Sequence, residues 1–263
     1  MTGAGAVVAL VLIEWTAGWV AGAAWTQSWG VVTRGHFRIT GYIVAVFSVL
    51  ALLANRHAVA DVRDAGLQPS LVTAMAVLVF LYLALQWSRS DVPAAVVGAL
   101  AGAAGVGALI ASAPLLRGWP DAMAAVGLIT GALLLGGVWN GMMLGHWYLN
   151  QPGLKTWALA RLTNVALAAT GASAAAGLIS VSELSNASTQ GAVLGLPGFG
   201  DSFSVVFFVV WVTLVLFTGA VVWGVRRCVK IKSIQSATGL FYVAVLTAGV
   251  SEFLVRYLMV NAT

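Results

Sequence analysis

Two acidic residues and one arginine stand inside otherwise apolar stretches of this chain. Glu14 lies in the run Val11–Trp15, and Glu252 precedes Arg256 by four residues in the segment Gly249–Tyr257. A carboxyl in apolar surroundings is suited to carry a proton, and a guanidinium can clamp an anion or a carbonyl oxygen. The plainer alternatives are a structural hydrogen bond or ion pair for Glu14 and a self-neutralising i, i+4 pair for Glu252 and Arg256.

Three further polar residues lie near the ends of apolar runs. His57 closes the second run, and an imidazole there can exchange protons with a neighbouring site. Asn140 and His146 end the fifth run and form a candidate second polar site, because a buried amide needs a partner. His146 and His36 could together ligate a haem iron, but both lie at or beyond run ends. A helix C-terminal cap or a second polar site is therefore the preferred interpretation of His146.

The composition shows what must position these residues. Of 263 residues, 60% are hydrophobic and only 8% are charged, against about 25% in an average soluble domain. The mean hydropathy is +0.96. These values exclude a disordered chain, a nucleic-acid-binding domain and an ordinary soluble enzyme. The single cysteine, Cys228, excludes an intrachain disulfide and a cysteine cluster for zinc or iron–sulfur. A polytopic membrane protein remains.

Eight apolar stretches approach the roughly 20 residues that a membrane-spanning helix needs. They predict an all-α bundle of about eight transmembrane helices forming one domain, residues 1–263, with spans near 5–25, 38–54, 70–87, 93–112, 121–146, 157–181, 202–224 and 237–259. The fourth stretch is rich in Gly and Ala and is the least secure. Without it the count is seven and the termini lie on opposite sides of the membrane.

The basic residues predict the orientation. With eight spans, nine of the 13 Lys and Arg residues fall in odd-numbered loops, and basic residues are retained on the cytoplasmic side. We therefore expect both termini outside, in the cytoplasmic (inner) membrane of a bacterium. Glu14, His57, Glu252 and Arg256 then all map to the external half of the bilayer. Their shared depth makes them one candidate site for a polar head group and for proton exchange.

Small residues recur at four-residue spacing in three of the expected spans. The first span has Gly18 and Gly22, the fourth Gly98 and Gly102, and the fifth Gly137, Gly141 and Gly145. Such spacing lets helix backbones approach closely in lipid. The structural interpretation is tight packing between helices of this chain. The functional interpretation is contact with a partner subunit or a flat cofactor.

Serine-protease and zinc chemistry find no support in the chain. The segment Gly171–Gly177 loosely resembles the serine segment of rhomboid proteases, which need a histidine on a later helix. All three histidines precede Ser173. The chain also lacks the His-Glu-x-x-His zinc pattern, a phosphate-binding glycine loop and a self-contained catalytic motif.

The final segment carries a resemblance to a known group. Eight spans, external termini and Ser251-Glu-Phe-Leu-Val-Arg-Tyr-Leu258, with the first helix around Glu14, look like membrane-anchor subunits of molybdopterin oxidoreductases. The group meant is the dimethyl-sulfoxide-reductase anchor type and its polysulfide-reductase-like relatives. The resemblance covers under a tenth of the chain. It implies quinol binding near the outer face and electron transfer to an iron–sulfur partner.

We therefore expect an integral subunit of a bacterial respiratory or electron-transfer complex. Its quinone and proton-exchange site would comprise Glu14, His57, Glu252 and Arg256. Haem b is a less favoured cofactor than quinone. The partners would be membrane lipids, other subunits and an iron–sulfur protein, with no nucleic acid.

Two alternatives remain open. One is a small-solute or ion transporter with Glu14 as the coupling carboxylate, against which the prolines count mildly because they lie outside span centres. The other is a structural scaffold subunit whose glycine-rich faces dock neighbouring molecules.

Overall fold

The chain folds into a bundle of long helices. The computed structural model describes residues 1–88, 90–116, 119–151, 153–179 and 202–261, and these contain no β-strand. Its eight long helices and one short 3-10 turn are α1 (Gly3–Gln27), α2 (Arg34–Ala58), α3 (Gln68–Leu85), α4 (Asp91–Ser112), η1 (Ala113–Leu115), α5 (Asp121–Trp147), α6 (Trp157–Ile179), α8 (Ser202–Lys230) and α9 (Ile234–Asn261). The predicted all-α class is confirmed.

All eight helices are long and apolar enough to cross a membrane. The shortest, α3, has 18 residues, which at about 1.5 Å per residue span about 27 Å. The Gly- and Ala-rich fourth stretch is a complete helix, because with η1 it extends over 25 residues. The count is therefore eight among the described residues, and the protein has the architecture of a multi-pass membrane protein.

The helix ends extend past the apolar cores expected from hydropathy. The second helix already begins at Arg34 and includes His57, and α8 continues through Arg227 to Lys230. Long basic side chains permit this extension, since their stems lie along apolar surface while their charges reach the interface.

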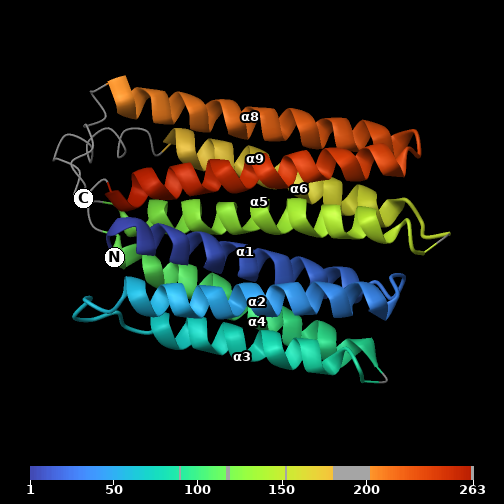
Figure 1. The fold of residues 1–263 in the computed structure, drawn as a ribbon, viewed down its shortest axis with the longest axis horizontal. Coiled ribbons are helices and arrows are strands. Elements are labelled where there is room, and N and C mark those ends of the chain that lie inside the picture. Colours follow the sequence, from blue (N-terminus) through green and yellow to red (C-terminus); the bar gives the residue numbers. More distant parts are fainter. Residues whose placement is uncertain (89, 117–118, 152, 180–201, 262–263) are drawn as a thin grey trace.

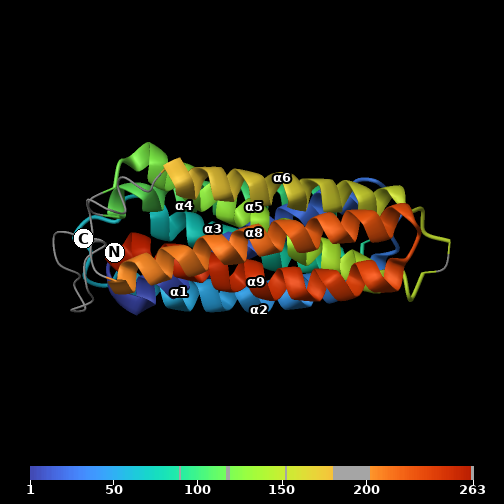
Figure 2. The same cartoon turned by 90° about the horizontal axis from the view of Figure 1, so that it is seen from above.

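The helices form two groups of four, each arranged as a ring of neighbours. In the first group α1 packs on α2 and α4, and α3 completes the ring; in the second, α5 packs on α6 and α9, and α8 completes it. The groups join mainly where α1 packs against α5. Figure 1 shows α1 and α5 side by side along the middle of the bundle, and Figure 2 shows α8 and α9 in front.

The first helix begins and the last ends at the same end of the bundle (Figure 1), as an even number of spans requires. We call this the terminal end and the other the opposite end. The side of the membrane on which the terminal end lies stays a prediction.

Glycines let the two groups approach at backbone distance. A Cβ on Gly18 would overlap the Ala132 carbonyl, and a Cβ on Gly136 would overlap the backbone of Gly18. In the predicted stripe of the fifth span, Gly137 contacts Ala166 of α6, and the Gly141 and Gly145 positions contact Phe241 and Thr238 of α9. These glycine faces are therefore covered by the chain's own helices.

A buried Glu–Arg–Glu cluster as the candidate functional site

The guanidinium of Arg256 joins two carboxylates in the interior of the bundle. Its Nε donates to Glu14 Oε1 at 2.6 Å, and its Nη2 donates to Glu252 Oε2 at 2.9 Å. The two glutamates are fully buried and Arg256 is 3% exposed. Three of the four residues predicted for the external site are thus in direct contact, and Glu14 pairs with Arg256 across 242 positions of sequence.

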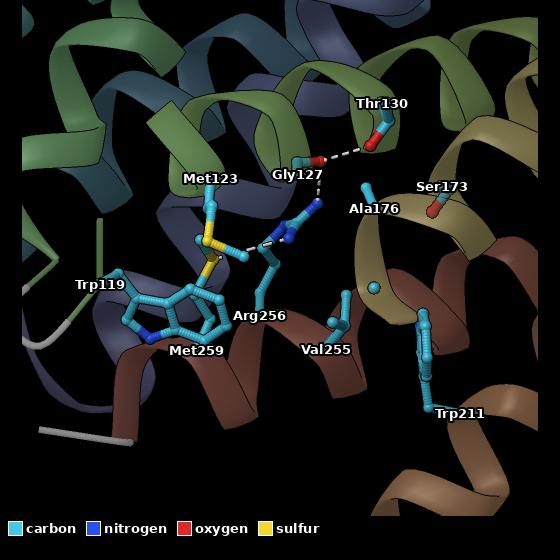
Figure 3. A pocket seen from close by; sticks show the side chains of 11 residues that line it. Trp119, Met123, Gly127, Thr130, Ser173, Ala176, Trp211, Val255, Arg256 and Met259 are labelled. Atoms are coloured by element: carbon cyan, nitrogen blue, oxygen red, sulfur yellow. Dashed lines mark hydrogen bonds between the residues drawn. The ribbon is translucent and has the colours of Figure 1, made fainter. Parts of the chain in front are cut away.

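Backbone and hydroxyl groups from two more helices hold this cluster. Arg256 Nη2 also donates to the Gly127 carbonyl of α5 at 2.7 Å, and that carbonyl accepts a second hydrogen bond from Thr130 Oγ1 at 2.9 Å. On α6, Ser173 Oγ donates to Glu252 Oε1 at 2.7 Å. Figure 3 shows Arg256 reaching from α9 toward Gly127. The cluster therefore draws on four helices, α1, α5, α6 and α9.

Gly131, which has no side chain, leaves room for the three charged groups. A Cβ on Gly131 would lie 2.5 Å from Arg256 Nη2, 2.6 Å from Glu252 Oε2 and 3.0 Å from Glu14 Oε1. The three charged groups therefore pack directly on the bare backbone of α5. Any larger residue at position 131 would push them apart.

The cluster carries one more negative than positive charge when all three groups are ionised. Glu14 Oε2 is buried and has no hydrogen-bond partner in the described part of the chain. An uncompensated charge in a low-dielectric interior is costly, and a buried group relieves that cost by taking up a proton or a counter-charge. The geometry therefore favours a bound proton or a counter-charge at the unpartnered oxygen of Glu14.

A small cavity lies beside the cluster, between α5, α6, α8 and α9. Arg256, Ser173 and Thr130 line it together with apolar groups from Trp119, Met123, Ala176, Trp211, Val255 and Met259 (Figure 3). Its volume is about 20 Å³, room for about one water molecule. The indole N–H groups of Trp119 and Trp211 are buried without an acceptor among the described residues. The lining therefore combines the guanidinium of Arg256 and the hydroxyls of Ser173 and Thr130 with a larger apolar surface.

His57 does not contact this cluster. Its side chain is exposed near the end of α2. It lines a separate polar cavity of about 610 Å³ with Asp61, Arg63 and Asp64 at the terminal end. The four predicted residues share an end of the bundle, but α2 is not among the helices that surround Arg256.

Asn140 and His146 do not form one polar site in the structure. Asn140 is buried and donates to the carbonyls of Trp19, at 3.1 Å, and Gly136, at 2.7 Å, so it ties α5 to α1. His146 lies six residues further along α5 with an exposed side chain. His36 is buried against the rings of Phe37 and Trp147.

Three contributors to the cluster were not predicted from the sequence, namely Gly127, Gly131 and Ser173. Gly127 and Gly131 have the four-residue spacing seen elsewhere in α5, which was a usable signal for close approach. The segment around Ser173 suggests a nucleophile, but a serine in an apolar helix is equally a donor to a buried carboxylate. None of the three indicates its partner without the tertiary structure.

Comparison with known proteins adds no further information about the site. No family model, no curated protein and no solved structure matches this chain. What is established is therefore the architecture, an eight-helix bundle of membrane-spanning character with a buried, four-helix ionic cluster in its terminal half.

Proposed function

We propose that the protein is an integral membrane subunit of an electron-transfer complex and that its Glu14–Arg256–Glu252 cluster exchanges a proton with a quinol. The observation that carries the proposal is the excess negative charge of this cluster beside a cavity that Arg256, Ser173 and Thr130 line. A buried carboxyl with an unpartnered oxygen can accept a proton without a large rearrangement. Arg256 stays as the fixed counter-charge for the other carboxyl.

The chemistry of a quinol suits these groups. Oxidation of a quinol to a quinone releases two electrons and two protons. One proton would pass to the cluster, the second to water outside the membrane, and the two electrons to a redox partner such as an iron–sulfur protein. The carbonyl oxygens of the product need donors, and Arg256, Ser173 and Thr130 are the lining residues whose side chains would supply them. Ring entry requires the cavity to widen, for which Met123 and Met259 are suited because methionine side chains adapt readily.

Binding of decylubiquinone to the purified full-length protein tests the proposal. Because a ligand that binds the folded state raises its stability, we expect decylubiquinone to raise the unfolding temperature of the wild type. Glu14→Gln should keep part of this effect, whereas Arg256→Gln should lose it. Arg63→Gln is the matched control, because Arg63 is exposed at the same end of the bundle.

Electron transfer is tested in native membranes. Quinol-dependent reduction of an acceptor should fall at least about tenfold in Glu14→Gln, the loss expected when a proton-transfer group is removed. The quinone site is wrong if Glu14→Gln and Arg256→Gln both leave quinol turnover and decylubiquinone stabilisation at the wild-type level.

A proton-coupled transporter is the second candidate, and one observation favours it. The Glu14–Arg256 ion pair connects α1 of the first helix group with α9 of the second. Protonation of Glu14 would remove its charge and release this link, which could couple proton binding to movement between the groups. Proton-driven solute uptake into proteoliposomes that disappears in Glu14→Gln, without any quinone effect, would select this function over the first.

A further inference from the structure

A cleft facing the surrounding lipid runs along α1 near the opposite end of the bundle. It consists of two adjoining cavities of about 540 and about 360 Å³, which share Ala21 and Trp25 in their linings. The larger lies between α1 and α4, and the smaller continues between α1, α5 and α6. Both volumes fall within the roughly 300–1,000 Å³ typical of ligand-binding pockets.

The lining of this cleft favours a hydrocarbon chain as its occupant. The smaller cavity is lined on α1 from Ala17 to Trp25, a length of about 12 Å. Apart from Asn140, whose amide already donates to the Trp19 and Gly136 carbonyls, its lining residues are apolar. Such a groove is better filled by hydrocarbon than by polar groups.

Beside the polar end of the cleft, just beyond its lining, Arg161 carries a positive charge with no carboxylate partner in the described residues. The ring of Trp25 packs on Trp29 at 4.8 Å, and the Arg161 guanidinium lies over the rings of Trp29 and Trp157, at 5.8 and 4.5 Å. Tryptophan rings and a guanidinium at a helix end are typical of the head-group region, where cationic side chains attract anionic lipids.

The one carboxylate that lines this end of the cleft is already neutralised. Asp91 accepts from Arg34 Nε at 2.8 Å and from Gln27 at 3.2 Å. Arg161 is therefore the group at the polar end whose charge an occupant could balance. Phosphate oxygens supply both the negative charge and the acceptors that a guanidinium binds.

We propose that this cleft binds one phospholipid with an anionic head group. Its phosphate lies beside Arg161, and one acyl chain follows α1 between α4 and α6. The site is independent of the ionic cluster, so the proposal holds whether or not a quinol binds beside Arg256. It would tie the two helix groups together at the end of the bundle that lacks the Glu14–Arg256 link.

Native mass spectrometry of the full-length protein tests the proposal, with added dioleoylphosphatidylglycerol or dioleoylphosphatidylcholine as probes. We expect one tightly retained phosphatidylglycerol in the wild type. Ala99→Phe should reduce retention of both lipids at least about tenfold, because Ala99 is exposed in the wall of the larger cavity. Arg161→Gln should weaken only phosphatidylglycerol, by about fivefold, the contribution of one basic side chain.

Matched controls separate the site from general lipid adhesion. Ala74→Phe adds the same side chain to an exposed position of α3 that lines neither cavity, and Arg63→Gln removes an exposed charge at the terminal end. Both should retain lipid as the wild type does. The proposal is overturned if Ala99→Phe retains lipid normally, if the controls lose as much as the variants, or if Ala99→Phe instead releases a quinone or a polypeptide.

Discussion

The two helix groups bury polar groups in different ways. In the first group, Asn55 and Gln68 exchange hydrogen bonds at 3.0 and 2.6 Å, and Gln27 donates to Gln86 at 2.9 Å. Such neutral amide pairs are complete, because each amide donates and accepts. At the junction with the second group the buried groups are charged, and one carboxylate oxygen, Glu14 Oε2, has no partner among the residues that the structure describes.

This difference distinguishes buried polar groups that only stabilise the fold, the amide pairs, from buried polar groups that can also change their charge, the ionic cluster. A fully hydrogen-bonded amide pair fixes the register of its two helices, and it contains no group that gains or loses a proton near neutral pH. An ionic cluster with a net charge of −1 can exist with or without an added proton. The two states differ in the strength of the Glu14–Arg256 ion pair, which connects α1 to α9. We therefore expect substitutions in the first group to alter stability alone and substitutions in the cluster to alter stability and function together.

The largest effect is expected for Arg256→Ala. Removing the only cation leaves two buried carboxylates without compensation, and breaking a buried ion pair in this way costs about 3–5 kcal/mol. Thermal unfolding in mild detergent measures the loss. Arg38→Ala, which removes an arginine packed on Trp87 at 5.3 Å, should cost no more than about 1 kcal/mol. Equal losses in the two variants would contradict the central role of Arg256.

The next effect is expected for Gly131→Ala. The added methyl would lie 2.5 Å from Arg256 Nη2, and overpacking of this kind costs about 1–3 kcal/mol. Gly171→Ala is the matched control, since Gly171 lies in α6 with open space around its Cβ position. That control should be neutral or stabilising by up to about 1 kcal/mol, because Ala is the better helix former. Similar destabilisation by both substitutions would show that the cluster does not depend on a bare backbone at position 131.

An effect of similar size is expected for Gln68→Leu in the first helix group. It leaves the buried Asn55 amide without its partner, at a cost of about 1–3 kcal/mol. The double variant Asn55→Leu/Gln68→Leu removes both amides and should recover most of the loss. Neither the single nor the double variant should alter quinol turnover or proton-coupled uptake. A functional defect without a stability loss would break the distinction between the two groups.

The smallest effect concerns Tyr148, in the turn between α5 and α6. Burial raises the pKa of its phenol above the usual value, while the hydrogen bond from the Leu159 amide lowers it by less. A raised folded-state pKa means that this contribution to stability is present below the unfolded pKa of about 10 and is lost as the pH rises through the folded value.

The substitution Tyr148→Phe tests the direction of this pH dependence of stability. The variant loses the hydrogen bond to the Lys155 carbonyl, a loss of about 0.5–1.5 kcal/mol at neutral pH. The difference from the wild type should shrink at strongly alkaline pH, when unfolding temperatures are compared. A difference that grows with alkaline pH would contradict the predicted direction.

The span count and the local ion pair could be predicted because both are local properties. Eight apolar stretches and the four-residue spacing of Glu252 and Arg256 are visible along the chain, and a helix brings such positions onto one face. The charge bias further predicted that Glu14 lies at similar depth. Depth alone could not distinguish Glu14, which reaches Arg256, from His57, which does not.

The sequence by itself determined the number of helices, their alternation across the bundle and the depth of each polar residue, because hydrophobicity and the helical repeat act along one dimension. Only the tertiary structure decided which residues at a given depth meet. The lateral order of the helices depends on the close approach of α1 and α5 at Gly18 and Gly136, and it sets Glu14 against Arg256 beside the bare backbone of Gly131. This lateral order depends on side-chain packing between helices that are far apart in sequence, and it is therefore not visible in any local sequence pattern.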